Sequence, residues 1–327
     1  MKKSAAVAGF IAAVILMCSF SAHSNAQTKE IVHDNLTEFD SVDISHAFEA
    51  TIAEGPYGVK VIVDNTLAPY VEVYVKGKTL YLGYDAKSVP ADIKKMYKSK
   101  KTPTPVFKAI IYTRRLEKVN INDNASLTGL SAFEAGKFEL TAFDKAQVKD
   151  LVIVASAARF TLKKNAYVSM NIDAANDIDI SADGSSDISL KQSSRDLTLN
   201  IAGSASASVS GDTKNLNISS AGSSETRMVS NATKVDIAAA NSSKIVLSGA
   251  AESILLKSAN SAFIDANEMP VQNADVTMNN SSSFNVNVSK SLGVNLSGGS
   301  QLYFTGKPEF KIDKVVKSTL APYASSK

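Results

Sequence analysis

IDISADGSSDISL, residues 178–190, places an apolar side chain at every second position on both sides of a Gly-Ser-Ser turn. This alternation is typical of β-strands with one buried face, because successive side chains of a strand point to opposite sides. Glycine at the turn accepts the left-handed backbone that a tight turn requires. The stretch therefore predicts two strands joined by a tight turn.

The same pattern recurs about every 19 residues. Tight turns fall at 184–186, 203–205, 222–224, 241–243, 260–262, 280–282 and 298–300, with fainter members near Asn124, Asp144 and Asn165. A looser turn follows each tight turn after roughly eight residues, at 211–212, 231–232, 249–250 and 267–270. A repeat of this length is the sequence signature of a solenoid.

Stacking these units predicts an all-β fold, a right-handed β-helix of two-strand rungs over residues 122–310. Two facing sheets would enclose a narrow interior. Alanine, serine and glycine near the tight turns suit the places where the sheets converge, and larger aliphatic residues fill the middle. Asn241, Asn260 and Asn280 occupy equivalent turns, so we expect their side-chain amides to form a ladder.

Residues 27–121 indicate an N-terminal β section without the 19-residue period. Strands are expected at 39–44, 48–53, 59–64, 71–75, 79–84, 107–112 and 116–121. A lysine-rich insertion at 86–105, with a short helix near 91–98, interrupts them. Such a section would cover the first rung and keep its open sheet edges from pairing with other chains. The C-terminal tail, 311–327, either closes the other end or extends freely.

The first 26 residues resemble an export signal. Lys2 and Lys3 precede an apolar segment from Ala5 to Met17, and Ser24 and Ala26 give a small-residue cleavage site. The segment is too short for a bilayer, which needs about 20 residues. The rest of the sequence offers no other transmembrane candidate. We therefore expect an exported protein, located in the periplasm, on the outer-membrane surface or outside the cell.

Removing this signal leaves a nearly neutral chain without cysteine. The 35 basic residues fall to 33 against 32 acidic ones, and Cys18, the only cysteine, is lost. A net charge of +1 gives no general attraction to nucleic acid, so we expect no nucleic-acid partner. The fold must be held by packing and hydrogen bonds alone.

On two features the chain resembles the putative adhesin family with a head GIN domain, exported proteins of Bacteroides-like bacteria. One is the Gly-Ser turn repeat that closes at Gly306-Lys307-Pro308. The other is the entry pattern at 39–44, 51–55, 59–61, 71–73 and 79–82. The resemblance spans roughly residues 38–310. Asparagine in several turns and the lysine-rich insertion depart from the family pattern.

This resemblance implies a β-helix similar in shape to pectin lyases, without an established catalytic site, and a role in cell adhesion. Fold alone does not define function, so a polysaccharide lyase or hydrolase on the same fold is a second hypothesis. A third is a periplasmic structural scaffold that self-associates into a homo-oligomer through its flat faces or its ends.

Residues suited to catalysis are sparse. The acidic candidates alternate with inward-facing isoleucines and are expected to project into solvent; they are Asp173, Asp177, Asp179, Asp183 and Asp187. Their spacing matches neither an EF-hand nor a calcium β-roll. Histidine is absent beyond His46, and the mature chain lacks the cysteines of a zinc site. We expect a non-enzymatic protein without cofactor or metal.

The lysine-rich insertion is the one charge-dense segment. Its candidate partner contacts, with a nearby arginine pair that would extend the same basic surface, are Lys94, Lys95, Tyr97, Lys98, Lys100, Lys101, Arg114 and Arg115. The alternative is a solvated loop. The sequence as a whole favours an exported binding or adhesion protein of the cell envelope that contacts glycans or cell-surface proteins through its solenoid surface.

Overall fold

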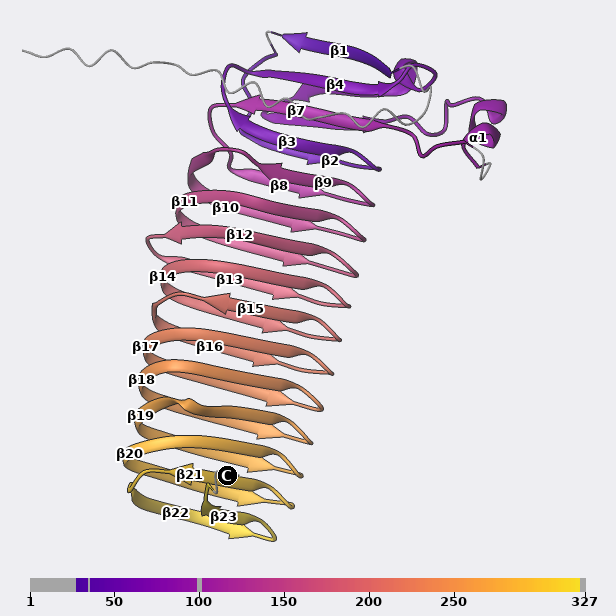
Figure 1. The fold of residues 1–327 in the computed structure, drawn as a ribbon. Coiled ribbons are helices and arrows are strands. Elements are labelled where there is room, and N and C mark those ends of the chain that lie inside the picture. Colours follow the sequence, from indigo (N-terminus) through magenta and orange to yellow (C-terminus); the bar gives the residue numbers. More distant parts are fainter. Residues whose placement is uncertain (1–27, 35, 99–101, 324–327) are drawn as a thin grey trace, which may run out of the picture.

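The computed structural model describes residues 28–34, 36–98 and 102–323. It shows an elongated β-solenoid with a head at its N-terminal end (Figure 1), which confirms the predicted all-β solenoid. The expected export signal lies outside the described residues. Within the described part, no helix is long and apolar enough to cross a membrane.

The elements divide into a head and a stack of rungs. The head contains β1 (Thr28–Asp34), β4 (Gly58–Asp64), the 3-10 helix η1 (Ala68–Tyr70), β5 (Val71–Lys76), β6 (Thr79–Tyr84), α1 (Ala91–Tyr97) and β7 (Phe107–Thr113). The rungs contain β2 (Ser41–Ile44), β3 (Glu49–Glu54), β8 (Lys118–Ile121), β9 (Ser126–Gly129), β10 (Ala132–Ala142), β11 (Gln147–Leu162), β12 (Tyr167–Ala174), β13 (Asp177–Ala182), β14 (Asp187–Ile201), β15 (Ser206–Ser210), β16 (Thr213–Ser220), β17 (Glu225–Ala240), β18 (Lys244–Ala259), β19 (Phe263–Asn279), β20 (Ser283–Ser297), β21 (Gln301–Thr305), β22 (Glu309–Val316) and β23 (Thr319–Pro322).

Two sheets run the full length of the molecule. The entry sheet holds the strands that lead into the tight turns, in the order β5, β6, β2, β8, β10, β11, β13, β14, β16, β17, β18, β19, β20, β22. The exit sheet holds the strands that leave them, in the order β1, β4, β7, β3, β9, β11, β12, β14, β15, β17, β18, β19, β20, β21, β23. Longer strands such as β17 bend from one sheet into the other.

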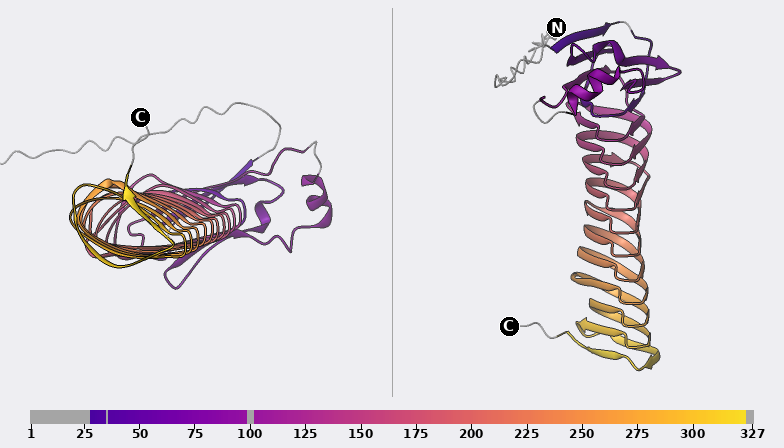
Figure 2. Two further views of the ribbon diagram at one scale, coloured as in Figure 1. Left: turned by 90° about the horizontal axis from the view of Figure 1, so that it is seen from below. Right: turned by 90° about the vertical axis from the view of Figure 1, so that its right-hand side faces the viewer.

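Apart from β1, which precedes β2, the head is formed by the part of the chain that lies between the first two rungs. β2 pairs in parallel with β8, and β3 with β9, although about 77 residues separate them. The rungs therefore take in β2 and β3, which precede residue 122. Between them the chain adds antiparallel strands to the outer edge of each sheet, β5 on β6 and β4 with β1 on β7. Figure 2 shows the head covering this end of the rod.

Every tight turn has a residue in the left-handed region at its first position, and the turns at 280–282 and 298–300 have a second, Ser281 and Gly299. The φ values at the first positions lie between 51° and 79°, at His46, Asp123, Asp144, Lys164, Gly184, Gly203, Gly222, Asn241, Asn260, Asn280, Gly298 and Lys317. The predicted turns from 184 onward are thus confirmed. The separate looser turns expected at 231–232, 249–250 and 267–270 are wrong, because β17, β18 and β19 run through these corners as single bent strands.

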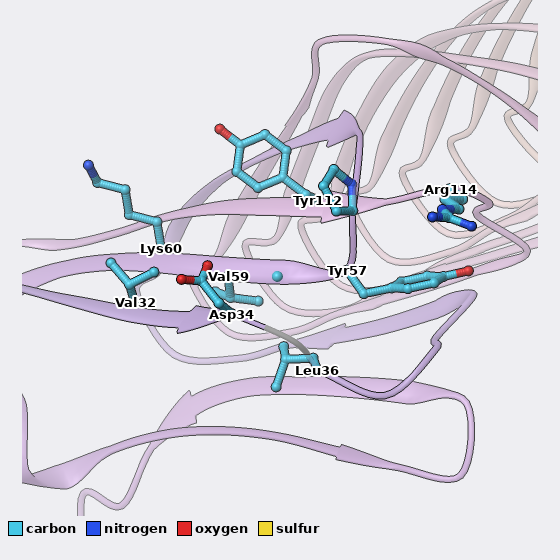
Figure 3. A pocket seen from close by; sticks show the side chains of 10 residues that line it. Val32, Asp34, Leu36, Tyr57, Val59, Lys60, Tyr112 and Arg114 are labelled. Atoms are coloured by element: carbon cyan, nitrogen blue, oxygen red, sulfur yellow. The ribbon is translucent and has the colours of Figure 1, made fainter.

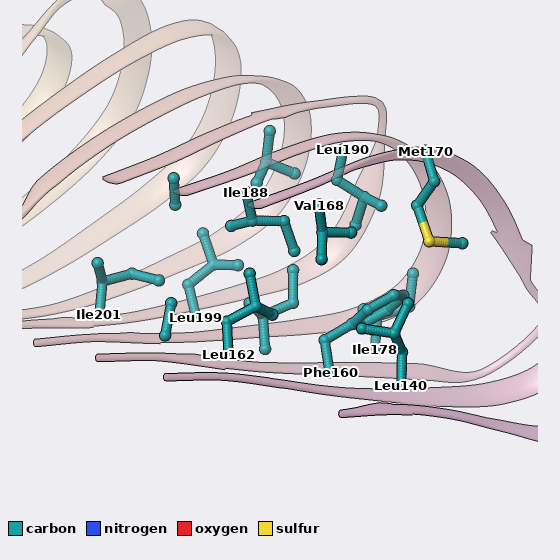
Figure 4. Close-up of a cluster of buried hydrophobic side chains, with 14 of the residues drawn as sticks. Leu140, Phe160, Leu162, Val168, Met170, Ile178, Ile188, Leu190, Leu199 and Ile201 are labelled. Carbon is teal, nitrogen blue, oxygen red and sulfur yellow. The ribbon is translucent and has the colours of Figure 1, made fainter. Parts of the chain in front are cut away.

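The interior follows the predicted gradient of side-chain size. A fully buried column of alanine and serine lies beside the tight turns, at Ala125, Ala146, Ala166, Ser186, Ala205, Ser224, Ser243, Ala262, Ser282 and Ser300. Larger side chains fill the middle of the rungs (Figure 4). Phe138 and Phe160 pack there with ring centroids 6.0 Å apart. Small residues are needed where the sheets meet, because larger ones would force them apart.

The predicted asparagine ladder is present. The Asn260 amide donates to Asn241 Oδ1 at 3.3 Å, and the Asn280 amide donates to Asn260 Oδ1 at 3.4 Å. Each asparagine also holds a left-handed backbone that most other side chains disfavour. Asn260 thus supports its turn in two independent ways.

Asn260→Ala is expected to lower the free energy of unfolding by about 1–2 kcal/mol, because it removes two amide hydrogen bonds and strains the backbone. Asn260→Gly removes the same bonds without the strain, so its loss should be smaller, at most about 1 kcal/mol. Guanidinium unfolding followed by circular dichroism measures both. Equal losses for the two variants would contradict the backbone contribution.

Candidate binding groove in the head

An open groove of about 760 Å³ lies on the outer face of the head (Figure 3). Its walls come from β1, the start of β4, the end of β7 and the segments beside them. The lining residues are Val32, Asp34, Leu36, Pro56, Tyr57, Gly58, Val59, Lys60, Tyr112 and Arg114. We refer to this feature as the head groove.

Antiparallel pairing brings these distant residues together. Gly58 is the register partner of Asp34 on β1 and also of Tyr112 on β7. Gly58 is buried, and a Cβ atom added to it would lie 3.3 Å from the His33 carbonyl oxygen. Because Gly58 has no side chain, β1 lies close to β4, and the groove stays open between the side chains on either side of Gly58.

Tyr57 and Arg114 form one wall of the head groove. The Arg114 guanidinium carbon lies 5.7 Å from the centre of the Tyr57 ring, within the range of a cation–π contact. The ring of Phe39 supports Tyr57 from the core, with centroids 5.5 Å apart. Burial, followed by the nearby Glu38 carboxylate, raises the pKa of Tyr57. The hydroxyl therefore keeps its proton at physiological pH and is placed to donate it to Glu38 in a hydrogen bond.

The remaining walls combine apolar and charged groups. Tyr112 is 36% exposed and Val32 is 50% exposed, so both present apolar surface to solvent. The Tyr112 ring packs beside Gly55, where an added Cβ would approach within 3.1 Å. Lys60 is held by Glu30 at 2.8 Å. Aromatic faces beside a few directed polar groups are typical of a site that binds a small molecule or a sugar ring.

The structure separates the predicted basic contacts into different environments. Arg114 lines the head groove, whereas Arg115 pairs with Glu117 at 2.8 Å. The Tyr97 hydroxyl is engaged internally, 2.8 Å from the Thr66 hydroxyl and 3.1 Å from Asp64 Oδ2. Lys94 donates to the Lys87 carbonyl at 3.1 Å. The other predicted lysines are Lys95 on α1 and Lys98 just after it, both exposed, and Lys100 and Lys101, outside the described residues.

Arg114 and the lysine-rich helix do not form one basic surface. β4 starts in the head groove at Gly58 and ends at Asp64, which contacts Tyr97 of α1. Seven residues of a strand span roughly 20 Å. The expectation that the arginine pair extends the basic surface of the insertion is therefore wrong for Arg114.

Three of the five acidic candidates on the rungs have structural partners, whereas Asp173 and Asp187 are exposed. Asp177 pairs with Arg195 at 3.2 Å, and Asp179 pairs with Arg159 at 3.4 Å. Asp183 accepts a hydrogen bond from the Gly184 amide at 2.6 Å, within its own turn. Across the described ranges, no group of three histidine, cysteine, aspartate or glutamate residues is arranged to hold a metal ion.

Fold and site together define a β-solenoid rod with a capped head and a surface groove. The chain belongs to the family described as "Putative auto-transporter adhesin, head GIN domain", which matches residues 38–229 and 198–308. Membership in an adhesin family is typical of exported or cell-surface proteins. A search of curated proteins found no match.

Three solved structures that are similar to this chain come from Parabacteroides. A putative adhesin from Parabacteroides distasonis is 15% identical with a TM-score of 0.42, covering 91% of this chain and 98% of that chain. A putative adhesin from Parabacteroides merdae is 14% identical with a TM-score of 0.34, covering 91% and 96%. A putative lipid binding protein from Parabacteroides distasonis is 16% identical with a TM-score of 0.30, covering 91% and 94%. None of these descriptions names an enzymatic activity.

Proposed function

We propose that this chain is an exported, non-enzymatic adhesion protein of the cell envelope that binds a glycan in the head groove. The observation that carries the proposal is that Tyr57, Tyr112 and Arg114 all line the head groove, with Arg114 over the Tyr57 ring. A sugar ring offers C–H groups to an aromatic face and hydroxyls to charged side chains. The head groove supplies both kinds of contact. Family membership supports the adhesive role.

Binding is favoured over hydrolysis by the count of carboxylates in the groove. Glycoside hydrolases commonly use two carboxyl groups about 5–9.5 Å apart, one on each side of the scissile bond. Asp34 is the single carboxylate among the lining residues, and the nearby Glu38 carboxylate is engaged with Tyr57. The head groove is therefore better suited to holding a sugar than to cleaving its glycosidic bond.

The head groove also differs from the flat outer faces of the rungs. On the entry sheet, Lys118 lies 3.6 Å from Glu139, and Arg159 lies 3.4 Å from Asp179. These charges are neutralised by one another along the stack. Arg114, in contrast, is directed at an aromatic ring and leaves its guanidinium hydrogens for a ligand. We place recognition in the head and assign the rungs a spacing role.

The test is binding to an array of uronate-bearing, sialate-bearing and neutral oligosaccharides, followed by calorimetry on the strongest hit. Arg114→Gln should weaken binding ten- to a hundredfold, because a hydrogen bond to a charged group contributes about 1.5–3 kcal/mol. Tyr112→Ser should weaken it similarly through loss of the aromatic face.

The matched control is Lys95→Gln combined with Lys98→Gln, which alters the other sequence-predicted region and should leave binding within twofold. Failure of every oligosaccharide to bind would overturn the proposal. So would loss of binding in the lysine variant with retention in Arg114→Gln. Melting curves of all variants confirm that each remains folded.

A further inference from the structure

The last rung leaves the end of the solenoid core uncovered. Phe310, Ile312 and Val315 on β22 are 43%, 54% and 38% exposed. Their register partners on β20 are Leu292, Val294 and Leu296, each at most 2% exposed. The same inward positions are therefore buried in one rung and open to solvent in the next. We call the surface formed by Phe310, Ile312, Val315 and Leu320 the open end.

The opposite end of the rod is closed. β4 lies in the exit sheet and β5 in the entry sheet, so the segment between them crosses over the end of the core. Leu67 and Ala68 in that segment are only 4% and 7% exposed, and the nearby Val89 is 5% exposed. Solenoids require such caps for solubility. Only one end of the described rod therefore presents apolar core to solvent.

We propose that the open end binds the open end of a second copy, giving a tail-to-tail dimer with the two heads at its far ends. This proposal is independent of glycan binding. In this dimer a two-fold axis runs perpendicular to both sheets. It places the entry sheet of one copy end to end with the entry sheet of the other, and the strands of the two copies run in opposite directions. β22 then lies antiparallel to β22 of the second copy, and β23 to β23, so the two open ends face each other over their whole width.

The charges of β22 suit pairing with itself. The strand carries Glu309 and Asp313 together with Lys311 and Lys314, two charges of each sign. The register between β20 and β22 shifts after Ile312, which leaves Asp313 as a bulged residue without a partner on β20. With Ile312 of both copies near the two-fold axis, Lys311 of one copy lies close to Asp313 of the other, and this pair occurs twice. Opposite charges directly across a strand pair stabilise it.

The apolar area is appropriate for a specific contact. Exposed apolar residues near the open end also include Val316 at 46% and Tyr323 at 37%. The exposed apolar area of these side chains is on the order of 400 Å² in total, which is the size of surface patches that mark interaction sites. That is about half of the ~800 Å² per partner of a specific interface. The free strand edges and charged side chains supply the rest.

Sedimentation and light scattering of the exported chain, residues 27–327, test the proposal. We expect a dimer at tens of micromolar, with small-angle scattering showing a particle about twice as long as the monomer. Ile312→Asp should weaken dimerisation at least tenfold, because it places a charge at the centre of the interface. Val229→Asp is the matched control, because Val229 is 55% exposed on the exit sheet, away from the open end.

A wild-type chain that stays monomeric at 100 µM would overturn the proposal, and so would a dimer that Ile312→Asp leaves intact. The length measurement on the wild-type chain decides without any variant, because a side-by-side dimer would keep the length of the monomer. Circular dichroism of Ile312→Asp distinguishes loss of the interface from loss of the fold.

Discussion

Gly211→Ala is expected to destabilise the solenoid by at least about 3 kcal/mol. Gly211 has a φ of 124° at the corner between β15 and β16. An added Cβ atom would lie 1.7 Å from the Gln192 carbonyl oxygen of the preceding rung. The backbone strain and the collision act together, and relief requires the two stacked rungs to separate locally. The midpoint of guanidinium unfolding, followed by circular dichroism, measures the effect.

Two other glycines separate these contributions. Gly77, in the turn between β5 and β6, has a φ of 62° with nothing within 4 Å of an added Cβ, so Gly77→Ala should cost about 1–2 kcal/mol from backbone strain alone. Gly136 on β10 also has open space and lacks a positive φ, so Gly136→Ala should be neutral or slightly stabilising. A Gly211→Ala variant no less stable than Gly77→Ala would show that the rungs yield easily at this corner.

Phe160→Ala is expected to lower the free energy of unfolding by about 3–5 kcal/mol. Phe160 is fully buried near the end of β11, between its register partners Leu140 and Ile180. Truncation leaves a cavity that strands hydrogen-bonded on both sides cannot close by collapsing. Phe138, whose ring centroid is 6.0 Å away, loses its packing partner as well.

The control for this variant lies on the same strand. Val154 on β11 is 49% exposed, so Val154→Ala should change stability by no more than about 0.5 kcal/mol. Thermal and guanidinium unfolding of the two variants should therefore differ clearly. Similar losses for both would mean that the inward and outward faces of β11 are wrongly assigned.

The rungs from residue 184 onward were predictable from sequence, because their turns use glycine or asparagine at nearly constant spacing. The first rungs were harder to find. Their left-handed positions are held by His46, Asp123, Asp144 and Lys164, residue types that give a weaker turn signal. In addition, the head separates His46 from Asp123, which hides the period at the point where the solenoid begins.

Of the residues that line the head groove, Arg114 alone was predicted from the sequence as a binding residue. Asp34, Tyr57 and Tyr112 are far apart in sequence and meet only because β1, β4 and β7 pair antiparallel in one register. Nothing in local composition encodes that register. The lysine-rich segment was conspicuous in sequence for its charge density, but the structure gives Tyr97 and Lys94 internal hydrogen-bond partners.

The stacking of the rungs sets the distance between the head and the far end of the rod. Each rung pairs only with the rungs directly before and after it, as β18 does with β17 and β19. Inserting or deleting one complete repeat would leave all other pairings intact and would move the head by one strand spacing, about 4.8 Å. The distance at which this protein holds its groove from its far end can thus change in small, regular steps during evolution, while the binding surface itself is left untouched.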